Sequence, residues 1–339
     1  MTQIPIAHLL LMHVKWFAPF DVHQMPKPVG EVLSGTFIKF FLASAVLIAV
    51  FFFADRYVYR RGLLSAFDAR LRKLDEFSIL ILRLAAAIFL TSVWAWHLAY
   101  GTAFYITPEL RTTAKFVPWF QLALALCALV RPALPAVGAG LLVLYLLALA
   151  DYGLFHLLDY LIFLGLGYFF TVANVKRGNW RKSGFIVLYA ATGITLLWAA
   201  MEKFAYPNWS YDLLSMHADM LVGMSPQTYM LVAGFMEFGL AFVLLGAASI
   251  AGRFVALGLQ GIFMLAIFKF GLLDAIGHLM IIAILLVLFV RGPTSAREIL
   301  VLKEKSIWME TYFMTGLYFL AFVLIFIAYY GLHGIFYRV

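Results

Sequence analysis

Long apolar segments recur along almost the entire chain, and they constrain its fold more than any other feature. A helix that spans a bilayer needs about 20 mainly apolar residues. Ten segments meet or nearly meet this length: 33–54, 78–100, 116–131, 133–151, 155–175, 184–205, 227–249, 253–273, 275–291 and 311–333. Only 12% of the residues are charged, against roughly a quarter in soluble domains. We therefore predict an all-α transmembrane bundle of about ten spans.

Basic residues gather in the connections between these segments. Six of them follow the first segment: Arg56, Arg60, Arg61, Arg70, Arg72 and Lys73. The connections 176–184 and 291–306 are also basic, and such loops face the cytoplasm. We predict a multi-pass protein of the bacterial inner membrane with both termini in the periplasm. Because the net charge of +8 is concentrated in these loops, we predict no nucleic-acid binding.

The predicted topology puts every histidine on the outer side of the membrane. These residues are His8, His13, His23, His97, His156, His217, His278 and His333. Histidine is the side chain most able to bind a metal or pass a proton near neutral pH. The distribution predicts chemistry at one membrane face.

Spans two to five and spans six to nine can be aligned with each other. HLAYGT at 97–102 matches KFAYPN at 203–208, PWFQLALAL at 118–126 matches GFMEFGLAF at 234–242, and DYGLFHLLDYL at 151–161 matches KFGLLDAIGHL at 269–279. We predict two four-helix repeats with one extra span at each end. The predicted parts are an outward-facing amphipathic N-terminal segment 1–32, a first span and basic connection 33–77, repeat 78–176, repeat 184–292, and a connection and last span 293–339.

The second repeat contains an ordered set of polar residues within apolar sequence. They are Glu202 and Lys203 in EKF, Glu237 in GFMEFGL, a basic turn at Arg253, and Asp274 and His278 in FGLLDAIGHL. This order resembles the DoxX-like family of four-helix membrane proteins, which includes the DoxD-type subunit of thiosulfate:quinone oxidoreductase. The resemblance covers about residues 185–292, and residues 80–176 resemble a degenerate copy. It implies a four-helix fold and a redox or metal-related setting.

Two groups of the second repeat are candidates for proton chemistry. Glu237 is the deepest acid, and Lys269 in the next span is a candidate counter-charge. Asp274 and His278 are four residues apart, so they share one face of a helix. An aspartate beside a histidine fixes its tautomer and raises its basicity, which suits proton acceptance or metal ligation. The alternative is a buried ion-pair network that only orders the bundle.

The first repeat offers a second set of candidates for cofactor binding. His156 and Asp159 share a helix face, and His97 with its neighbour Trp96 lies at the outer end of another span. Two of His97, His156, His278 and His333 could ligate a haem across the bundle. The alternative for His97 is a residue of the aromatic belt.

Histidine and methionine also gather outside the spans. His8 and His13 lie in the amphipathic segment, and the loop 206–226 holds Met216, His217 and Met220. Thioether and imidazole ligands suit copper, so these five residues are candidate ligands of copper or iron. The alternative is that the methionines only fill gaps in packing.

These observations favour a membrane redox subunit with a quinone- or haem-associated site near the outer leaflet. Glu202, Lys203, Glu237, Asp274 and His278 would form the site, with His97, Trp96, His156, Asp159 and Lys269 around the cofactor. A partner protein would exchange electrons with it. Binding or transport of copper or iron is one alternative, and a structural anchor for a membrane complex is another.

Overall fold

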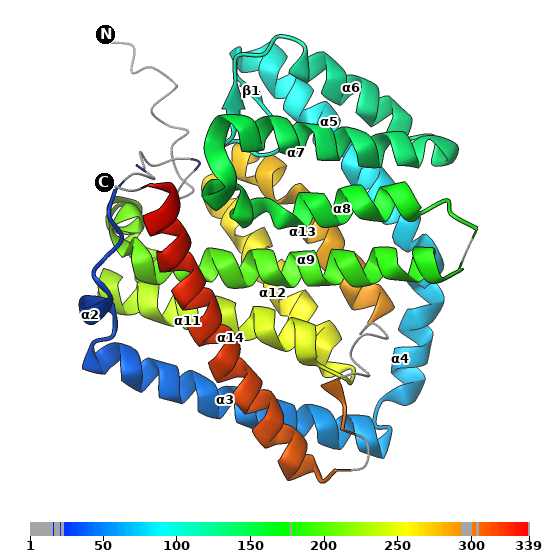
Figure 1. Ribbon diagram of the computed structural model, residues 1–339. Helices are drawn as coiled ribbons and strands as arrows, with labels where there is room; N and C mark the ends of the chain where they lie inside the picture. The colour runs from blue at the N-terminus through cyan, green and yellow to red at the C-terminus, as the bar shows by residue number, and fades with distance from the viewer. Residues whose placement is uncertain are drawn as a thin grey trace.

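The protein is a multi-pass helical membrane protein. The computed structural model describes residues 16, 21, 24–176, 178–292, 300–302 and 305–337 (Figure 1). Within this part of the chain, 8 stretches are long and apolar enough to cross a membrane. The all-α bundle predicted from the sequence is confirmed at this level.

Helices occupy all ten predicted segments. The long ones are α3 (Gly35–Arg61), α5 (Ser78–Tyr100), α7 (Leu134–Leu157), α9 (Gly178–Ala205), α11 (Pro226–Gly246), α12 (Ala251–Phe270), α13 (Leu272–Arg291) and α14 (Ile307–Phe336). The helices α6 (Val117–Ala128) and α8 (Leu161–Val172) have 12 residues each. A helix of this length spans about 18 Å, which is less than a hydrocarbon core of about 30 Å. The number of crossings therefore stays a prediction.

Shorter elements connect the long helices. They are α2 (Val29–Val32), α4 (Ser65–Arg72), η2 (Lys73–Phe77), η3 (Arg131–Ala133), η4 (Leu158–Tyr160), η5 (Pro207–Ser210), α10 (Tyr211–Met216) and η6 (Ala218–Leu221). A two-stranded hairpin between α5 and α6 pairs β1 (Ala103–Phe104) with β2 (Arg111–Thr112) in antiparallel register.

Serine residues set the beginnings of three spans. The hydroxyl of Ser34 accepts a hydrogen bond from the backbone of Phe37, Ser225 accepts one from Thr228, and Ser306 accepts one from Met309. Each bond satisfies an N–H group of the first helical turn that has no partner within the helix. The sequence thus fixes where α3, α11 and α14 begin.

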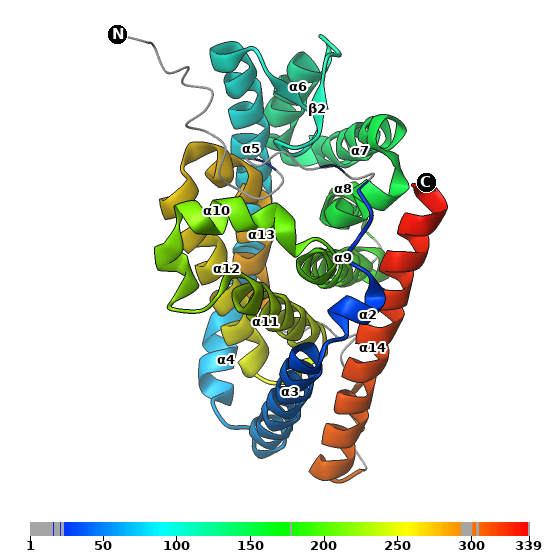
Figure 2. The same ribbon diagram turned by 90° about the vertical axis from the view of Figure 1, so that its left-hand side faces the viewer.

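Eight helices form a closed ring in which each packs on the next along the chain (Figure 2). Their order is α5, α6, α7, α8, α9, α11, α12 and α13, and α13 returns to pack on α5. Small residues allow the closest approaches: a Cβ at Gly138 would lie 2.5 Å from the carbonyl oxygen of Gly167. The helices α3 and α14 pack on each other outside the ring, where α3 contacts α11 and α14 contacts α9.

Two glycines with left-handed backbone angles lie at matching positions of the aligned sequences. Gly153 has φ 79° and ψ 165°, and Gly271 has φ 81° and ψ −154°. Only glycine adopts this region readily. Gly153 breaks α7 before η4 and α8, and Gly271 separates α12 from α13. The shared break fits the predicted repeat.

Alanine at either glycine is expected to lower the free energy of unfolding by about 1–3 kcal/mol, because the cost lies in the backbone. A Cβ at Gly153 or Gly271 would meet nothing within 4 Å, so a clash with neighbouring atoms would not explain a loss of stability. Gly258 and Gly261 in α12 have the same open surroundings without a positive φ, and they are the matched controls. Thermal unfolding in detergent should show lower midpoints for Gly153→Ala and Gly271→Ala and unchanged or higher ones for Gly258→Ala and Gly261→Ala. Equal effects in all four variants would refute the backbone explanation.

The five described histidines lie toward one end of the bundle. His97, His156 and His333 are in the last turns of α5, α7 and α14, His278 is near the beginning of α13, and His217 follows α10. At the same end, the segment before α2 is bonded to α9 and α14: the Lys27 N–H donates to the carbonyl of Ala205 at 2.8 Å, and the Tyr330 hydroxyl donates to the carbonyl of Lys27 at 2.9 Å. His8, His13 and His23 lie outside the described residues.

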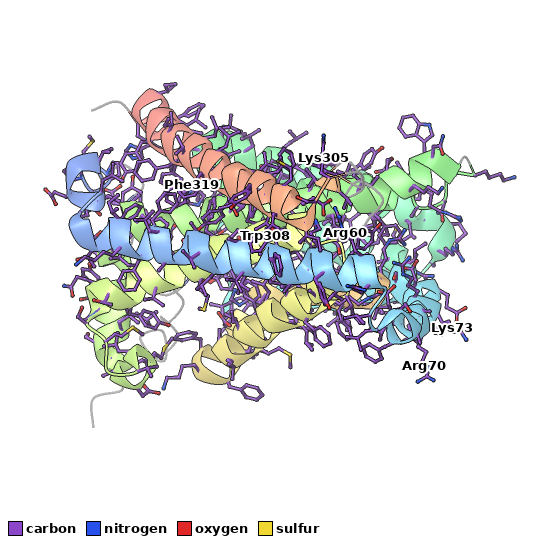
Figure 3. All side chains as sticks on the ribbon, turned by 90° about the horizontal axis from the view of Figure 1, so that it is seen from below. Arg60, Arg70, Lys73, Lys305, Trp308 and Phe319 are labelled. Atoms are coloured by element: carbon purple, nitrogen blue, oxygen red, sulfur yellow. The ribbon has the colours of Figure 1, made fainter. Side chains whose placement is uncertain are left out.

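Buried charges hold the opposite, basic end together. The carboxylate of Asp55 accepts hydrogen bonds from the backbone of Ala248 and Ser249, both at 2.9 Å, and pairs with Arg56. Glu310 at the beginning of α14 pairs with Arg60 at 2.9 Å. Arg60 lies where α3 ends beside this helix, whereas Arg70 and Lys73 point away from the bundle (Figure 3). These contacts join α3 and α14 to the turn between α11 and α12.

Arg253 forms a second contact network at the basic end. Its guanidinium donates to Asp68 at 2.8 Å, to the carbonyl of Arg291 at 3.2 Å, and to the carbonyls of Phe289 and Val290. A helix end leaves carbonyl groups without partners, and a basic side chain can satisfy them. Arg253 therefore fixes the end of α13 against α12 and α4.

Candidate functional site

A cavity of about 310 Å³ lies within the helix ring, near the histidine end. Residues of α8, α9, α11, α12 and α13 form its walls, and residues of α10, η6 and the loop between α5 and α6 also line it. Most lining side chains are apolar, including Phe163, Leu196, Leu214, Met230, Phe263 and Ile281. This size and composition are typical of a site for a small organic ligand.

Four of the predicted catalytic residues line this cavity: Glu202, Lys203, Glu237 and His278. The ammonium of Lys203 lies 2.7 Å from a carboxylate oxygen of Glu237. The two side chains are 24% and 26% exposed, so each remains accessible while paired. The cavity therefore has an ion pair at the boundary between α9 and α11.

His278 is held on one side by Asp274, the fifth predicted catalytic residue. Its Nδ1 lies 3.0 Å from a carboxylate oxygen of Asp274, which is fully buried. The imidazole packs against the rings of Trp16 and Phe263, with centroid distances of 4.7 and 4.9 Å. A Cβ at Gly277 would collide with the Trp16 indole, so glycine allows this indole to reach the cavity. The Asp274 carboxylate orients the imidazole.

A third group of polar residues near the cavity includes Glu109, which lies in the connection between α5 and α6. Glu109 lies between the two strands of the hairpin, accepts a hydrogen bond from the Tyr160 hydroxyl and forms an ion-pair contact with Nε2 of His156. Glu109, Tyr160 and the predicted Asp159 line the cavity, whereas His156 does not line it and contacts the buried side chain of Glu109. In the aligned sequences, His156 and Tyr160 occupy the positions of Asp274 and His278.

The amide of Gln121 holds the loop that carries Glu109. It donates to the carbonyls of Phe104 and Tyr105 at 2.7 and 2.8 Å. The Tyr105 hydroxyl in turn donates to Asp151 at 2.5 Å. Sequence reasoning missed Glu109, although the four-residue spacing of His156 and Tyr160 was a signal that a polar partner could lie beside them.

The predicted pairing of Lys269 with Glu237 is wrong. Lys269 lies 2.6 Å from Asp219 of η6, and Lys203 occupies the place next to Glu237. The hydrogen bond and the charge of Lys269 lower the pKa of the Asp219 carboxyl below its usual value. This pair ties α12 to the segment that follows α10.

Two other cofactor candidates, Trp96 and His97, are in α5 and do not line the cavity. The indole of Trp96 packs on Tyr100 with a centroid distance of 4.1 Å. His333 packs against Phe155 and Tyr206 at 5.4 and 5.9 Å. Among the histidines in the described part of the chain, His278 is the one that lines the cavity. No two of the predicted haem ligands His97, His156, His278 and His333 therefore line this cavity together.

The predicted metal ligands are dispersed where the structure describes them. Met216 is exposed, His217 packs on the Phe270 ring at 5.8 Å, and Met220 lines the cavity. In the described ranges, no three side chains of histidine, cysteine, aspartate or glutamate are grouped as metal ligands. His8 and His13 lie outside those ranges, so the outer metal site stays a prediction.

Comparisons with protein-family models, curated proteins and solved structures give no match to this chain. The DoxX-like resemblance therefore remains a prediction, and functional inference depends on the cavity itself.

Proposed function

We propose that the protein is the quinone-binding subunit of a membrane oxidoreductase and that its cavity holds the quinone ring. The observation that carries this proposal is the convergence of the Lys203–Glu237 pair and the Asp274–His278 pair on one apolar cavity. Apolar walls suit the ring, and the charged and imidazole groups suit its two oxygen atoms.

The chemistry follows from what each group can donate or accept. The Lys203 ammonium donates hydrogen bonds, which a quinone carbonyl accepts. The Glu237 carboxylate and the His278 imidazole are bases that can take a proton from a hydroquinone. Oxidation of a hydroquinone releases two protons and two electrons, and in this proposal the electrons pass to a redox protein bound to this subunit.

The proposal includes the finer topology predicted from the sequence. The helix ends next to the basic connections, such as the end of α3 at Arg61 and the beginning of α14 at Ile307, lie opposite the histidine end. This favours an arrangement with the cavity near the periplasmic leaflet of the inner membrane and both termini outside. The matching glycines at 153 and 271 favour two DoxX-like repeats among ten spans. Cysteine labelling of positions 27 and 182 in intact cells would test this orientation.

Short-chain ubiquinone or menaquinone added to the purified protein in nanodiscs is expected to quench tryptophan fluorescence in a saturable way. Trp16 lines the cavity, whereas Trp119 on α6 is exposed and does not line it. Trp16→Phe should therefore remove much of the saturable quenching, and Trp119→Phe should retain it. Linear quenching that is identical in both variants would contradict a quinone site here.

Two measurements on the same sample separate the alternatives. A Soret band would favour haem, and stoichiometric copper or iron in elemental analysis would favour a metal-handling protein. Saturable quinone binding without either would support the proposal.

A further inference from the structure

The helices α11 and α12 pack on each other near the turn that joins them and separate toward the histidine end (Figure 1). Burial along one face of α11 records this separation. Leu244, near the turn, is buried, whereas Glu237 and Ala233, one turn and more beyond it, are partly exposed. Residues three or four positions apart lie on the same face of a helix. The face of α11 that these residues share therefore loses its neighbour toward the histidine end.

One face of α12 changes in the same way. Val255 and Leu259 are buried, and Ile262 and Ala266, which continue the same face, are partly exposed. All buried residues of α12 lie in its first half, between residues 252 and 259. The second half of α12 is therefore packed less closely against the rest of the bundle than the first half.

The space between the separated helices leads into the cavity. It is here named the α11–α12 opening, and its border residues also line the cavity: Ala233, Glu237, Ile262 and Ala266. All lining residues that α12 contributes are partly exposed. On the other walls, Phe163 of α8, Leu196 of α9 and Met280 of α13 are buried. The cavity is therefore more accessible from the side of α11 and α12 than through these other helices.

The surface outside the α11–α12 opening is apolar. Met236 on α11 and Leu265 on α12 are exposed there, Leu265 at 70%. Both helices are long and apolar enough to cross a membrane, so these side chains face hydrocarbon. At the histidine end, by contrast, α10 lines the cavity with Leu213 and Leu214, and both are buried. The opening therefore leads to the bilayer rather than to water.

We infer that the ligand enters the cavity from the bilayer through the α11–α12 opening, and that it carries a long apolar tail which stays in this opening. The inference rests on the proposed quinone-binding function and narrows the ligand to lipid-soluble quinones. Transfer of apolar surface out of water is favourable, so such a tail keeps the molecule in the bilayer. Ionisable residues at membrane depth often mark the path of a ligand. The half-exposed Lys203–Glu237 pair is on this side of the cavity, where an entering ring meets it.

Photolabelling in nanodiscs tests the path of the tail directly. The probe is a ubiquinone analogue with a diazirine in its tail, and mass spectrometry locates the labelled residues after illumination. Labelling that excess untagged ubiquinone suppresses is expected on both sides of the α11–α12 opening, for example at Ala233, Met236 and Leu265. Suppressible labelling confined to α10 and η6, or to the contact between α5 and α13, would overturn the inference.

Replacement of Ala266 by phenylalanine should narrow the α11–α12 opening. Its affinity for decylubiquinone is expected to fall about tenfold, because a larger side chain in an occupied space forces its neighbours to shift. Affinity for the same ring without a tail should fall by about twofold or less, since this ligand does not occupy the opening. Leu265→Phe is the matched control: Leu265 is the neighbouring residue, it is exposed, and it does not line the cavity. This variant should retain both affinities.

A second variant separates a blocked opening from a folding defect. Ala233→Phe narrows the opening from α11 and should give the same selective loss, with a thermal unfolding midpoint measured for each variant. Equal losses for the tailed and the tail-less ligand would mean that the new side chains obstruct the ring site, and this would overturn the inference. Unchanged affinity for both ligands would overturn it as well and leave the quinone site intact. If neither ligand binds the wild-type protein in a saturable way, both proposals fall.

Discussion

Replacement of Arg253 by methionine is expected to lower the free energy of unfolding by about 3–5 kcal/mol, as found when one partner of a buried ionic network is removed. The Arg253 side chain is fully buried, and it contacts Asp68 and the carbonyls of residues 289, 290 and 291. Methionine has a similar length but cannot donate to any of them. The carbonyls at the end of α13 would then lie buried without this partner.

Thermal or denaturant unfolding in one detergent would measure the effect. Arg70→Met is the matched control, because Arg70 is exposed and points away from the bundle (Figure 3). Its unfolding midpoint should stay close to wild type. Arg253→Lys should be intermediate, since an ammonium can reach fewer of these acceptors than a guanidinium. Similar midpoints for Arg253→Met and Arg70→Met would show that the network contributes little.

Replacement of Lys203 by methionine is expected to weaken quinone binding by about 10- to 100-fold, because a hydrogen bond from a charged donor contributes about 1.5–3 kcal/mol. The substitution removes the ammonium that lies 2.7 Å from Glu237 and lines the cavity. It also leaves the Glu237 carboxylate without this counter-charge. A quinone carbonyl next to an uncompensated carboxylate is repelled by it.

A second lysine provides the control. Lys269 makes an ion pair of similar length with Asp219 but does not line the cavity, so Lys269→Met should retain quinone affinity. The double variant Lys203→Met with Glu237→Leu removes both charges. It should recover thermal stability without recovering affinity. Equal losses of affinity in Lys203→Met and Lys269→Met would show that the cavity ion pair does not contact the ligand.

The local features of the site were predictable, because they depend on residues close together in the sequence. The four-residue spacing of Asp274 and His278 places them on one helix face, and their side chains are 3.0 Å apart. The ten apolar segments likewise correspond to helices. The lengths of α6 and α8 were predicted less well, because the apolar segments 116–131 and 155–175 are longer than the 12-residue helices that form within them.

Partners from distant segments were not predictable in the same way. Lys269 is close to the aligned motif in sequence, yet the counter-charge of Glu237 comes from Lys203 at the end of α9. Glu109 joins His156 and Tyr160 only because a hairpin folds over the end of α7. Such pairings depend on helix packing, and no periodicity within a single segment encodes them.

Basic residues near the predicted loops illustrate a further limit. The positive-inside rule treats them as solvated charges that set orientation. Arg56 and Arg253 are instead fully buried and bind carboxylates and carbonyl groups. Composition alone does not separate a topological signal from a structural ion pair.

Contact between α5 and α13 has a consequence for biogenesis. Because α5 is the first helix of the ring in the sequence and α13 is the last, the ribosome synthesises α5 long before α13. Until α13 is inserted, the cavity lacks one of its walls, and acidic residues such as Glu237 can be exposed to hydrocarbon. Each such exposure costs a few kcal/mol. Closure of the ring is thus a late, long-range step in membrane insertion. A nascent chain arrested before Leu272 would leave the gap between α5 and α12 open, with ionisable side chains exposed to lipid.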